Sequence, residues 1–113
     1  MSEHEWIKEF PAEVIVCDGQ GNILGMNDKA AQSTASEGGY ALIGKNVLDC
    51  HPGLSRGKVE QLLTTQEKKV YTVEQNSIKK LIYQSPWYKE GQYAGLLELS
   101  LEIPLEMEHF VRS

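Results

Sequence analysis

The stretch Leu97-Glu98-Leu99-Ser100-Leu101-Glu102-Ile103 has the clearest period in this amino-acid sequence. Apolar and polar residues alternate along it, which is the pattern of a β-strand with one buried face and one face toward water or polar neighbours. Burying its apolar side chains would contribute roughly 6 to 12 kcal/mol before the entropy cost, at roughly 1.5 to 3 kcal/mol each. We therefore expect a strand in the middle of a sheet, with its leucine side facing the core.

Two further strands are expected upstream of this one. Residues 70–73, Val-Tyr-Thr-Val, favour β-structure, and a second run extends over residues 81–88. The turn residues Lys-Glu-Gly-Gln at 89–92 then lead into the closing strand. Pro86 cannot donate a backbone hydrogen bond, so we expect a bulge or lost pairing near it.

The beginning of the chain predicts a hairpin followed by a helix. The run Val-Ile-Val-Cys at 14–17 indicates a mostly buried strand, turn residues follow at 18–21, and an extended pattern resumes at 22–26. The side chain of Asn27 can accept a hydrogen bond from the amides of a first helical turn, and Asp28 suits the positive end of a helix dipole. We therefore expect a short helix from residue 28.

Helices are expected between these two groups of strands. Residues 33–53 mix turn residues with apolar anchors, which is typical of single-turn helices over a core. Ser55 can cap a longer helix, in which Val59, Leu62 and Leu63 have the i, i+3, i+4 spacing that places them on one side.

An apolar stripe precedes the first strand. Trp6, Ile7 and Phe10 have helical spacing with charged residues between them, and Pro11 ends the segment. A helix this short is not stable alone, and its apolar stripe therefore needs a surface to pack against. The residues leave two possibilities open, this chain's own sheet or a second copy of the chain.

Composition restricts the class of protein. The chain has 113 residues, enough for one domain, and a formal net charge of −5. The acidic balance disfavours nucleic acid as a partner, and the short apolar runs disfavour a membrane-spanning segment. The N-terminus lacks the pattern of a signal peptide and two cysteines are too few for a disulfide scaffold, so we expect a cytoplasmic protein.

Strands at both ends with helices between them imply an α+β fold, with one antiparallel sheet and helices on one face. The order of several short motifs resembles that of the PAS (sensory box) domain family over residues 12–104. These motifs are Asp18, Gly21, Ile23, Asn27 and Ala30, the segment Leu-Ile-Gly-Lys-Asn-Val-Leu at 42–48, and the closing hairpin at 83–103. The resemblance implies a five-stranded sheet in the order 2-1-5-4-3. The amphipathic helix predicted from the residue pattern precedes this domain at 1–11, and a tail follows it at 105–113.

Two segments carry a narrower resemblance. Cys50-His51-Pro52 and the tail from Ile103 to Arg112 are similar to PAS units appended to bacterial hemerythrin-like proteins. The tail is too short for a signalling coiled coil. We therefore expect the signal to pass to a separate protein, unless the chain is a piece of a longer one.

The resemblance implies a module for sensing and signal transduction, which would bind a small molecule in an apolar pocket between sheet and helices and act through dimerisation or a partner protein. The alternative is a ligand-free interaction module with a filled core. A void of about 300 Å³ or more would favour the sensor. The candidate pocket residues are Val47, Leu48, His51, Val59, Leu62, Leu63, Tyr71, Tyr83, Leu97 and Leu99. The candidate homodimer interface consists of Trp6, Ile7 and Phe10.

The cofactor, if there is one, is not identified by the residues. The light-sensing flavin subgroup of the family needs a cysteine directly after the asparagine of a Gly-x-Asn-Cys segment, and this chain has Val47 there. Photoactive flavin is therefore not expected. Haem would need an axial histidine, for which His51 is the candidate, although a histidine at a helix boundary more often binds a backbone carbonyl or fixes a loop.

No catalytic or metal site is expected. Cys50 and His51 are adjacent in the chain, and adjacent side chains seldom face each other as nucleophile and base. Two cysteines and one central histidine lack the spacing of a metal site. The carboxylates form no pair placed for acid-base chemistry, so we expect a protein that is not an enzyme.

Overall fold

The computed structural model describes residues 5–50 and 54–113. The strands are β1 (Glu13–Asp18), β2 (Ile23–Met26), β3 (Lys69–Gln75), β4 (Ile78–Lys89) and β5 (Gln92–Ile103). The α-helices are α1 (Glu5–Lys8), α2 (Asp28–Ser33) and α3 (Leu54–Thr65), and the single-turn 3₁₀ helices are η1 (Ala35–Glu37), η2 (Gly39–Leu42) and η3 (Val47–Cys50). The predicted order of elements is confirmed.

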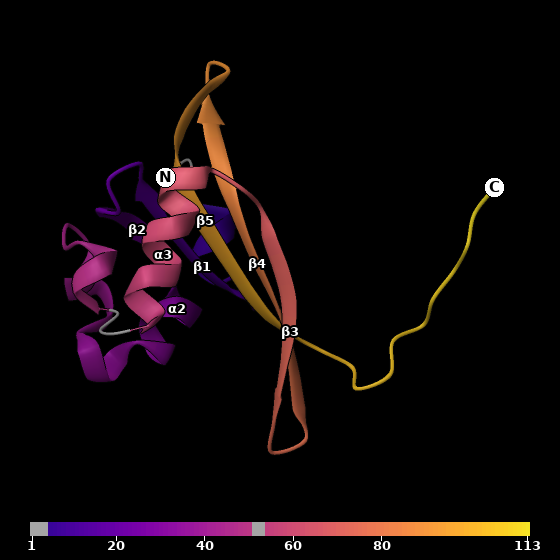
Figure 1. Ribbon diagram of the computed structural model, residues 1–113. Helices are drawn as coiled ribbons and strands as arrows, with labels where there is room; N and C mark the ends of the chain where they lie inside the picture. The colour runs from indigo at the N-terminus through magenta and orange to yellow at the C-terminus, as the bar shows by residue number, and fades with distance from the viewer. Residues whose placement is uncertain (1–4, 51–53) are drawn as a thin grey trace.

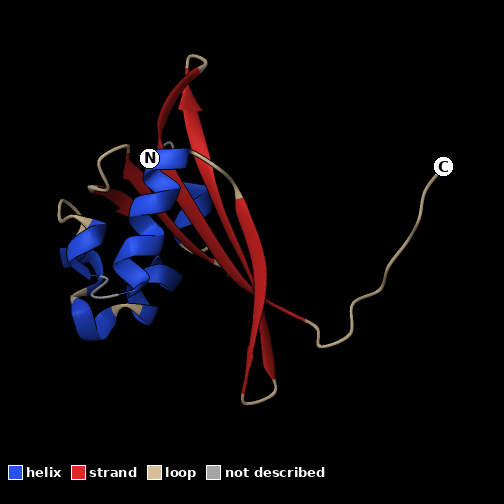
Figure 2. Ribbon diagram, in the orientation of Figure 1, coloured by secondary structure: helices blue, strands red, loops and turns tan. Residues whose placement is uncertain are grey.

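The strands form one antiparallel five-stranded sheet in the order β2-β1-β5-β4-β3, as predicted. The closing strand β5 lies in the middle, where it pairs with β1 from Glu13 opposite Ser100 to Asp18 opposite Gly95. On its other side β5 pairs with β4 along its whole length. Helices α2 and α3 and the single-turn helices between them lie on one face of the sheet (Figure 1; Figure 2). We call the opposite face, which these helices do not cover, the open face.

The irregularity expected near Pro86 is present. Pro86 lies opposite Leu96, and the register between β4 and β5 shifts one residue later, between Trp87 and Tyr88. The pairing of β4 with β3 ends at Gln84, before the proline. The missing N–H of Pro86 therefore leaves no gap in a ladder with β3.

The leucine side of β5 faces away from the helices, so our expectation that it faces the core beneath them is wrong. Leu96 packs against Leu63 of α3 in the buried core and thereby marks the helix-facing side of the strand. Because side chains alternate along a strand, Leu97 and Leu99 lie on the open face. Their partners across β1 are Val16 and Val14, and both leucines are half-buried.

The alternation of apolar and polar residues does not by itself identify the face of the strand that the helices cover. Alternation shows that the two faces of a strand differ, but the register and the packing decide which face the helices cover. The helix-facing position next to Leu96 is Glu98, and this residue borders a cavity instead of a closed core.

The core between sheet and helices is small. Its buried centre consists of Cys17, Leu63 and Leu96, and the half-buried side chains packed around it are Val47, Leu48, Val59 and Leu62. No large side chain among the described residues is completely buried. The two layers therefore leave space between them.

The end of the chain continues past the sheet. Residues 104–113 form neither helix nor strand, and they run away from the end of β5 (Figure 1). None of the helices formed by residues 5–50 and 54–113 has the length and apolar character needed to cross a bilayer.

Candidate functional site

A cavity of about 230 Å³ lies between the helix-facing side of the sheet and the helical layer. Its apolar lining consists of Ile15, Cys17, Ile23, Met26, Leu42, Val47, Val59 and Leu96. Its polar lining consists of Glu13, Thr34, Glu37, Gln84 and Glu98. Among the described residues that line it there is no lysine, arginine or histidine, so the polar part of the wall is acidic.

The helical wall is tied to the sheet by backbone hydrogen bonds along the edge of β2. Ile23 donates its N–H to the carbonyl of Lys45 at 2.8 Å and accepts from the N–H of Gly44 at 2.8 Å. Val47 donates its N–H to the carbonyl of Gly21 at 2.7 Å. These bonds fix the start of η3, and with it Val47, against the cavity.

Gly21 permits this close approach of the wall to the first hairpin. Its φ of +91° lies in the region that favours glycine, and a Cβ there would lie 3.1 Å from Cγ1 of Val47 and 3.2 Å from Cδ1 of Leu63. The turn glycine identified in the sequence therefore also shapes the edge of the cavity.

Two of the carboxylates on the cavity wall are held by neighbouring side chains. Glu98 accepts a hydrogen bond from Nε2 of Gln84, its partner on β4, at 2.8 Å. Glu13 accepts a hydrogen bond from the hydroxyl of Ser33 and lies 3.5 Å from Nζ of Lys80. Three strands, β1, β4 and β5, thus bring these groups to one side of the sheet.

The pKa values of two nearby groups reflect the burial of this region. Burial raises the pKa of the Cys17 thiol, which favours the protonated thiol over the nucleophilic thiolate. Burial also raises the pKa of Tyr71, and the charge of Glu98 raises it further. The charge of Glu98 on β5 therefore acts on Tyr71 of β3, across the intervening strand β4.

The predicted pocket residues of the helical layer lie at or beside the cavity. Val47 and Val59 line it. Leu48, Leu62 and Leu63 lie in the core cluster next to it. The helical half of the predicted pocket is thus brought together.

The predicted pocket residues of the sheet are distributed differently. Leu97, Leu99 and Tyr83, which pairs with Leu99, lie on the open face and do not line the cavity. Tyr71 pairs with Ile82 on the helix-facing side but is 39% exposed and lies outside the cavity wall. His51 lies outside the described residues.

Sequence reasoning missed most of the sheet's contribution to the wall, above all Glu13, Gln84 and Glu98. The alternation in β5 separates Glu98 from the leucines, but it gives no side to either set. The side on which Glu98 lies follows only from the pairing of β1 with β5. In that pairing Glu98 lies opposite Ile15 and next to the pair formed by Cys17 and Leu96.

The apolar stripe of α1 is partly exposed. Its backbone is held to this chain, because Asn27 donates from Nδ2 to the carbonyl of Ile7 at 3.1 Å and Lys8 pairs with Asp28 at 3.1 Å. Trp6 is nevertheless 73% exposed and Phe10 is 45% exposed. Helix α1 ends at Lys8, so Phe10 lies just beyond it. The segment is therefore anchored on its own chain, while the side chains of Trp6 and Phe10 remain available to a partner.

The described part of the chain offers no metal site, since no group of three or more His, Cys, Asp or Glu residues within it could hold an ion.

Comparison with known proteins places the fold. No protein-family model and no curated protein matches the sequence. The PAS domain of BvgS from Bordetella pertussis is similar in structure, with a TM-score of 0.64, 20% identity and coverage of 87% of this chain and 81% of that one.

Two further solved structures are similar. The PAS domain of nitrogen regulation protein NR(II) from Vibrio parahaemolyticus has a TM-score of 0.57 and 15% identity, over 91% of this chain and all of that one (100%). The Aer2 receptor from Vibrio cholerae, described as a dual PAS-haem oxygen sensor, has a TM-score of 0.63 and 15% identity, over 81% of this chain and 94% of that one. With its strand order and helical face, the chain has the fold of PAS sensory domains.

Proposed function

We propose that this chain is a sensory module for signal transduction that binds a small molecule in the cavity beneath η3 and α3. The observation that carries the proposal is the cavity itself, about 230 Å³ of space with a mixed lining where a filled core would be close-packed. This volume falls short of the roughly 300 Å³ that we expected to favour a sensor, the size at which sites for drug-sized ligands begin. It equals the share of about seven or eight water molecules, so the ligand is a small metabolite.

The connection of the cavity to the rest of the chain supports a signalling role. Leu42 and Val47 line the cavity from η2 and η3, and the residues between them are hydrogen-bonded to the edge of β2. A ligand that contacts both side chains would stabilise one arrangement of this wall over others. The change would reach β1 through its pairing with β2 and from there the segment of α1.

Filling the cavity tests this proposal. Val59→Phe adds volume to its wall, and Gln61→Phe places the same side chain on the exposed side of α3 as a control. Native mass spectrometry of protein purified from cells should show an added small mass on wild type and on Gln61→Phe, and its loss on Val59→Phe. The proposal would be contradicted if wild type had the mass of the chain alone and if no compound in a panel of metabolites raised its melting temperature.

An interaction module is the second candidate, and the open face of the sheet favours it. The half-buried Leu97, Leu99 and Leu101 lie there, on the side opposite the core formed with α3, and Trp6 is exposed on α1. We propose that the chain forms a homodimer through Trp6, Ile7 and Phe10, or docks a separate signalling protein. The resemblance around Cys50 and in the tail suggests a hemerythrin-like partner.

Haem fits the described part of the cavity poorly. No histidine lines it, its volume is below that of sites for drug-sized ligands, and three carboxylates border it. The haem alternative through His51 therefore rests on the sequence alone. An absorption spectrum of the purified protein tests it, because bound haem would give a strong Soret band.

We further propose that the protein is not an enzyme and that it works in a reducing, cytoplasmic compartment. Cys17 is a buried free thiol whose pKa is raised by burial, which suits a core residue and not a catalyst.

A further inference from the structure

We propose that the cavity takes a small organic cation, an amine or guanidine attached to a short apolar body, with Glu98 as its ionic partner. This inference rests on the proposed ligand-binding function and adds the chemical class of the ligand. Its basis is the placement of a carboxylate on the helix-facing side of the central strand, within a wall that is otherwise mostly apolar.

Glu98 occupies the middle of the sheet surface that faces the helices. Its neighbours across the strands are Ile15 on β1 and Gln84 on β4, so one side of it is apolar and the other carries an amide. A carboxylate in such a place loses part of its hydration, which costs free energy unless another group replaces the water.

The described residues compensate the charge of Glu98 only in part. Its one hydrogen-bond donor among them is Nε2 of Gln84, at 2.8 Å, and an amide brings no positive charge. Glu13 differs, because Lys80 lies 3.5 Å from it and Ser33 donates to it. The third carboxylate, Glu37, is exposed to solvent and accepts a hydrogen bond from Ser36. Glu98 is therefore the cavity carboxylate best placed to bind a cation from outside.

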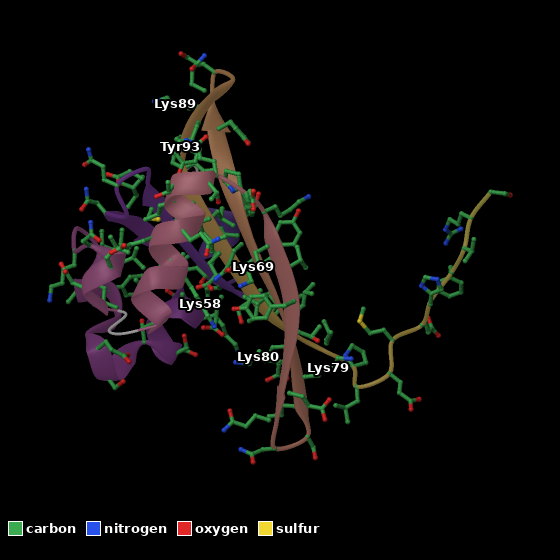
Figure 3. All side chains as sticks on the ribbon, viewed as in Figure 1. Lys58, Lys69, Lys79, Lys80, Lys89 and Tyr93 are labelled. Carbon is green, nitrogen blue, oxygen red and sulfur yellow. The ribbon has the colours of Figure 1, made fainter. Side chains whose placement is uncertain are left out.

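The lysines around the cavity are engaged elsewhere or lie outside it. Lys69 lies one strand beyond Gln84, and its Nζ is 5.6 Å from the centre of the Tyr71 ring. Lys58 of α3 is exposed, and Lys80 of β4 lies by Glu13. Figure 3 shows these three side chains on their separate elements, and none of them lines the cavity. An anionic ligand would therefore meet carboxylates without a matching cation.

The rest of the wall specifies the body of the ligand. Ile23, Leu42, Val47 and Leu96 offer apolar contacts, so a short hydrocarbon chain would be favoured over a strongly hydrated one. A bare metal ion is disfavoured, because no group of ligands for one exists among the described residues. The combination of an acidic group with an apolar wall therefore selects an organic monocation.

A matched set of probes tests the charge requirement. Pentan-1-amine, pentan-1-ol and pentanoate have the same chain and differ in the charge of the head group at pH 7. Isothermal titration calorimetry should show binding of the amine at least about tenfold tighter than that of the alcohol, and no binding of pentanoate up to about 10 mM. Chemical shift changes at Val47 and Leu96 would place the amine in the cavity.

Variants of two glutamates on β5 supply the internal control. Glu98→Gln keeps the shape and the hydrogen bond to Gln84 but removes the charge, and it should weaken amine binding about tenfold or more while leaving the alcohol unchanged. Glu102→Gln removes an exposed charge from the same strand, outside the cavity, and should leave both affinities unchanged. Circular dichroism confirms that each variant is folded.

The outcomes separate this inference from the function on which it rests. Equal binding of amine and alcohol, or amine binding that survives Glu98→Gln, overturns the cationic ligand but leaves a binding cavity. Binding of none of the probes, together with the bare native mass of wild type, overturns both.

Discussion

Asn27 shows how much a single side chain contributes to this fold. It is 2% exposed, and its Oδ1 accepts from the N–H of Ala30 at 3.2 Å and from that of Val14 at 3.0 Å. Its Nδ2 donates to the carbonyls of Ala12 at 2.7 Å and Ile7 at 3.1 Å. The predicted cap of α2 is confirmed, and the same residue also joins α1 and β1.

Asn27→Ala should therefore cost more than a helix cap alone. Loss of a cap costs about 1 kcal/mol, and the buried carbonyls and N–H groups left without partners raise the expected cost to about 2 to 4 kcal/mol. Chemical denaturation measures the free energy of unfolding, with Gln32→Ala on the exposed side of α2 as the control. A cost under about 1 kcal/mol would mean that the network beyond the cap contributes little.

Asp18 adds a pH dependence in the first hairpin. Its partial burial raises the pKa of the carboxyl, but hydrogen bonds from Asn22 and from the backbone of Gln20 and Gly21 outweigh this and hold the pKa below its usual value. A lowered folded-state pKa stabilises the protein above the unfolded pKa of about 3.9, and the gain is lost as the pH falls through the folded value.

Asp18→Asn should thus be less stable than wild type at pH 7, by about 1 to 2 kcal/mol. The difference should shrink as the pH is lowered from about 4, because the wild-type carboxyl is then protonated. Unfolding curves at several pH values measure this, and a difference that stays constant down to pH about 2 would exclude a role for the Asp18 charge.

At the scale of elements, β5 depends on one glycine. Gly95 has a φ of +151°, and a Cβ there would lie 1.9 Å from the carbonyl oxygen of Cys17 on the neighbouring strand. The Trp87 indole, from the residue paired with Gly95, donates to that same oxygen at 2.9 Å. Only glycine permits this crossing of β1 and β5.

Gly95→Ala should destabilise the protein by more than about 3 kcal/mol, since both the clash with backbone and the strained φ must be relieved by moving a central strand. Gly57→Ala is the matched control, because a Cβ there meets nothing within 4 Å and alanine favours a helix. Thermal melts should show a large drop for the first variant and no drop for the second. Similar melting temperatures would contradict the close approach.

The two faces of β5 should also respond differently to truncation. Leu96 is 9% exposed and packs with Cys17 and Leu63, so Leu96→Ala should cost about 2 to 5 kcal/mol. Leu99 is half-buried on the open face, so Leu99→Ala should cost only about 1 to 2 kcal/mol. Chemical denaturation of both variants measures the loss in free energy of unfolding for each. An equal or larger loss for Leu99→Ala would indicate that the open face is covered in solution.

At the scale of the whole molecule, exposed apolar side chains point to association. The proposed homodimer through α1 predicts that wild type elutes as a dimer in light scattering and that Trp6→Glu elutes as a monomer. Ile43→Glu, at another exposed apolar position (42% exposed), should leave the mass unchanged. A monomeric wild type would contradict the dimer, and dissociation by Leu99→Glu but not by Trp6→Glu would move the interface to the open face.

The sequence determined the local structure of this protein. The turn residues at 18–21, the cap at Asn27 and the alternation at 97–103 act over a few neighbouring residues, so their outcomes, a hairpin, a helix start and a two-faced strand, could be predicted without the rest of the chain. The strand order was predicted through the resemblance, because the motifs follow one another in the order found in that family.

Tertiary structure decided which face of the sheet the helices cover. That choice depends on the register between β1 and β5, whose paired residues Ile15 and Glu98 are far apart in sequence, and on the tie between β2 and the segment before η3. Such contacts form only when distant segments meet, and a one-residue change of register would exchange the faces. The leucines therefore lie on the open face, and Glu98 lies in the cavity.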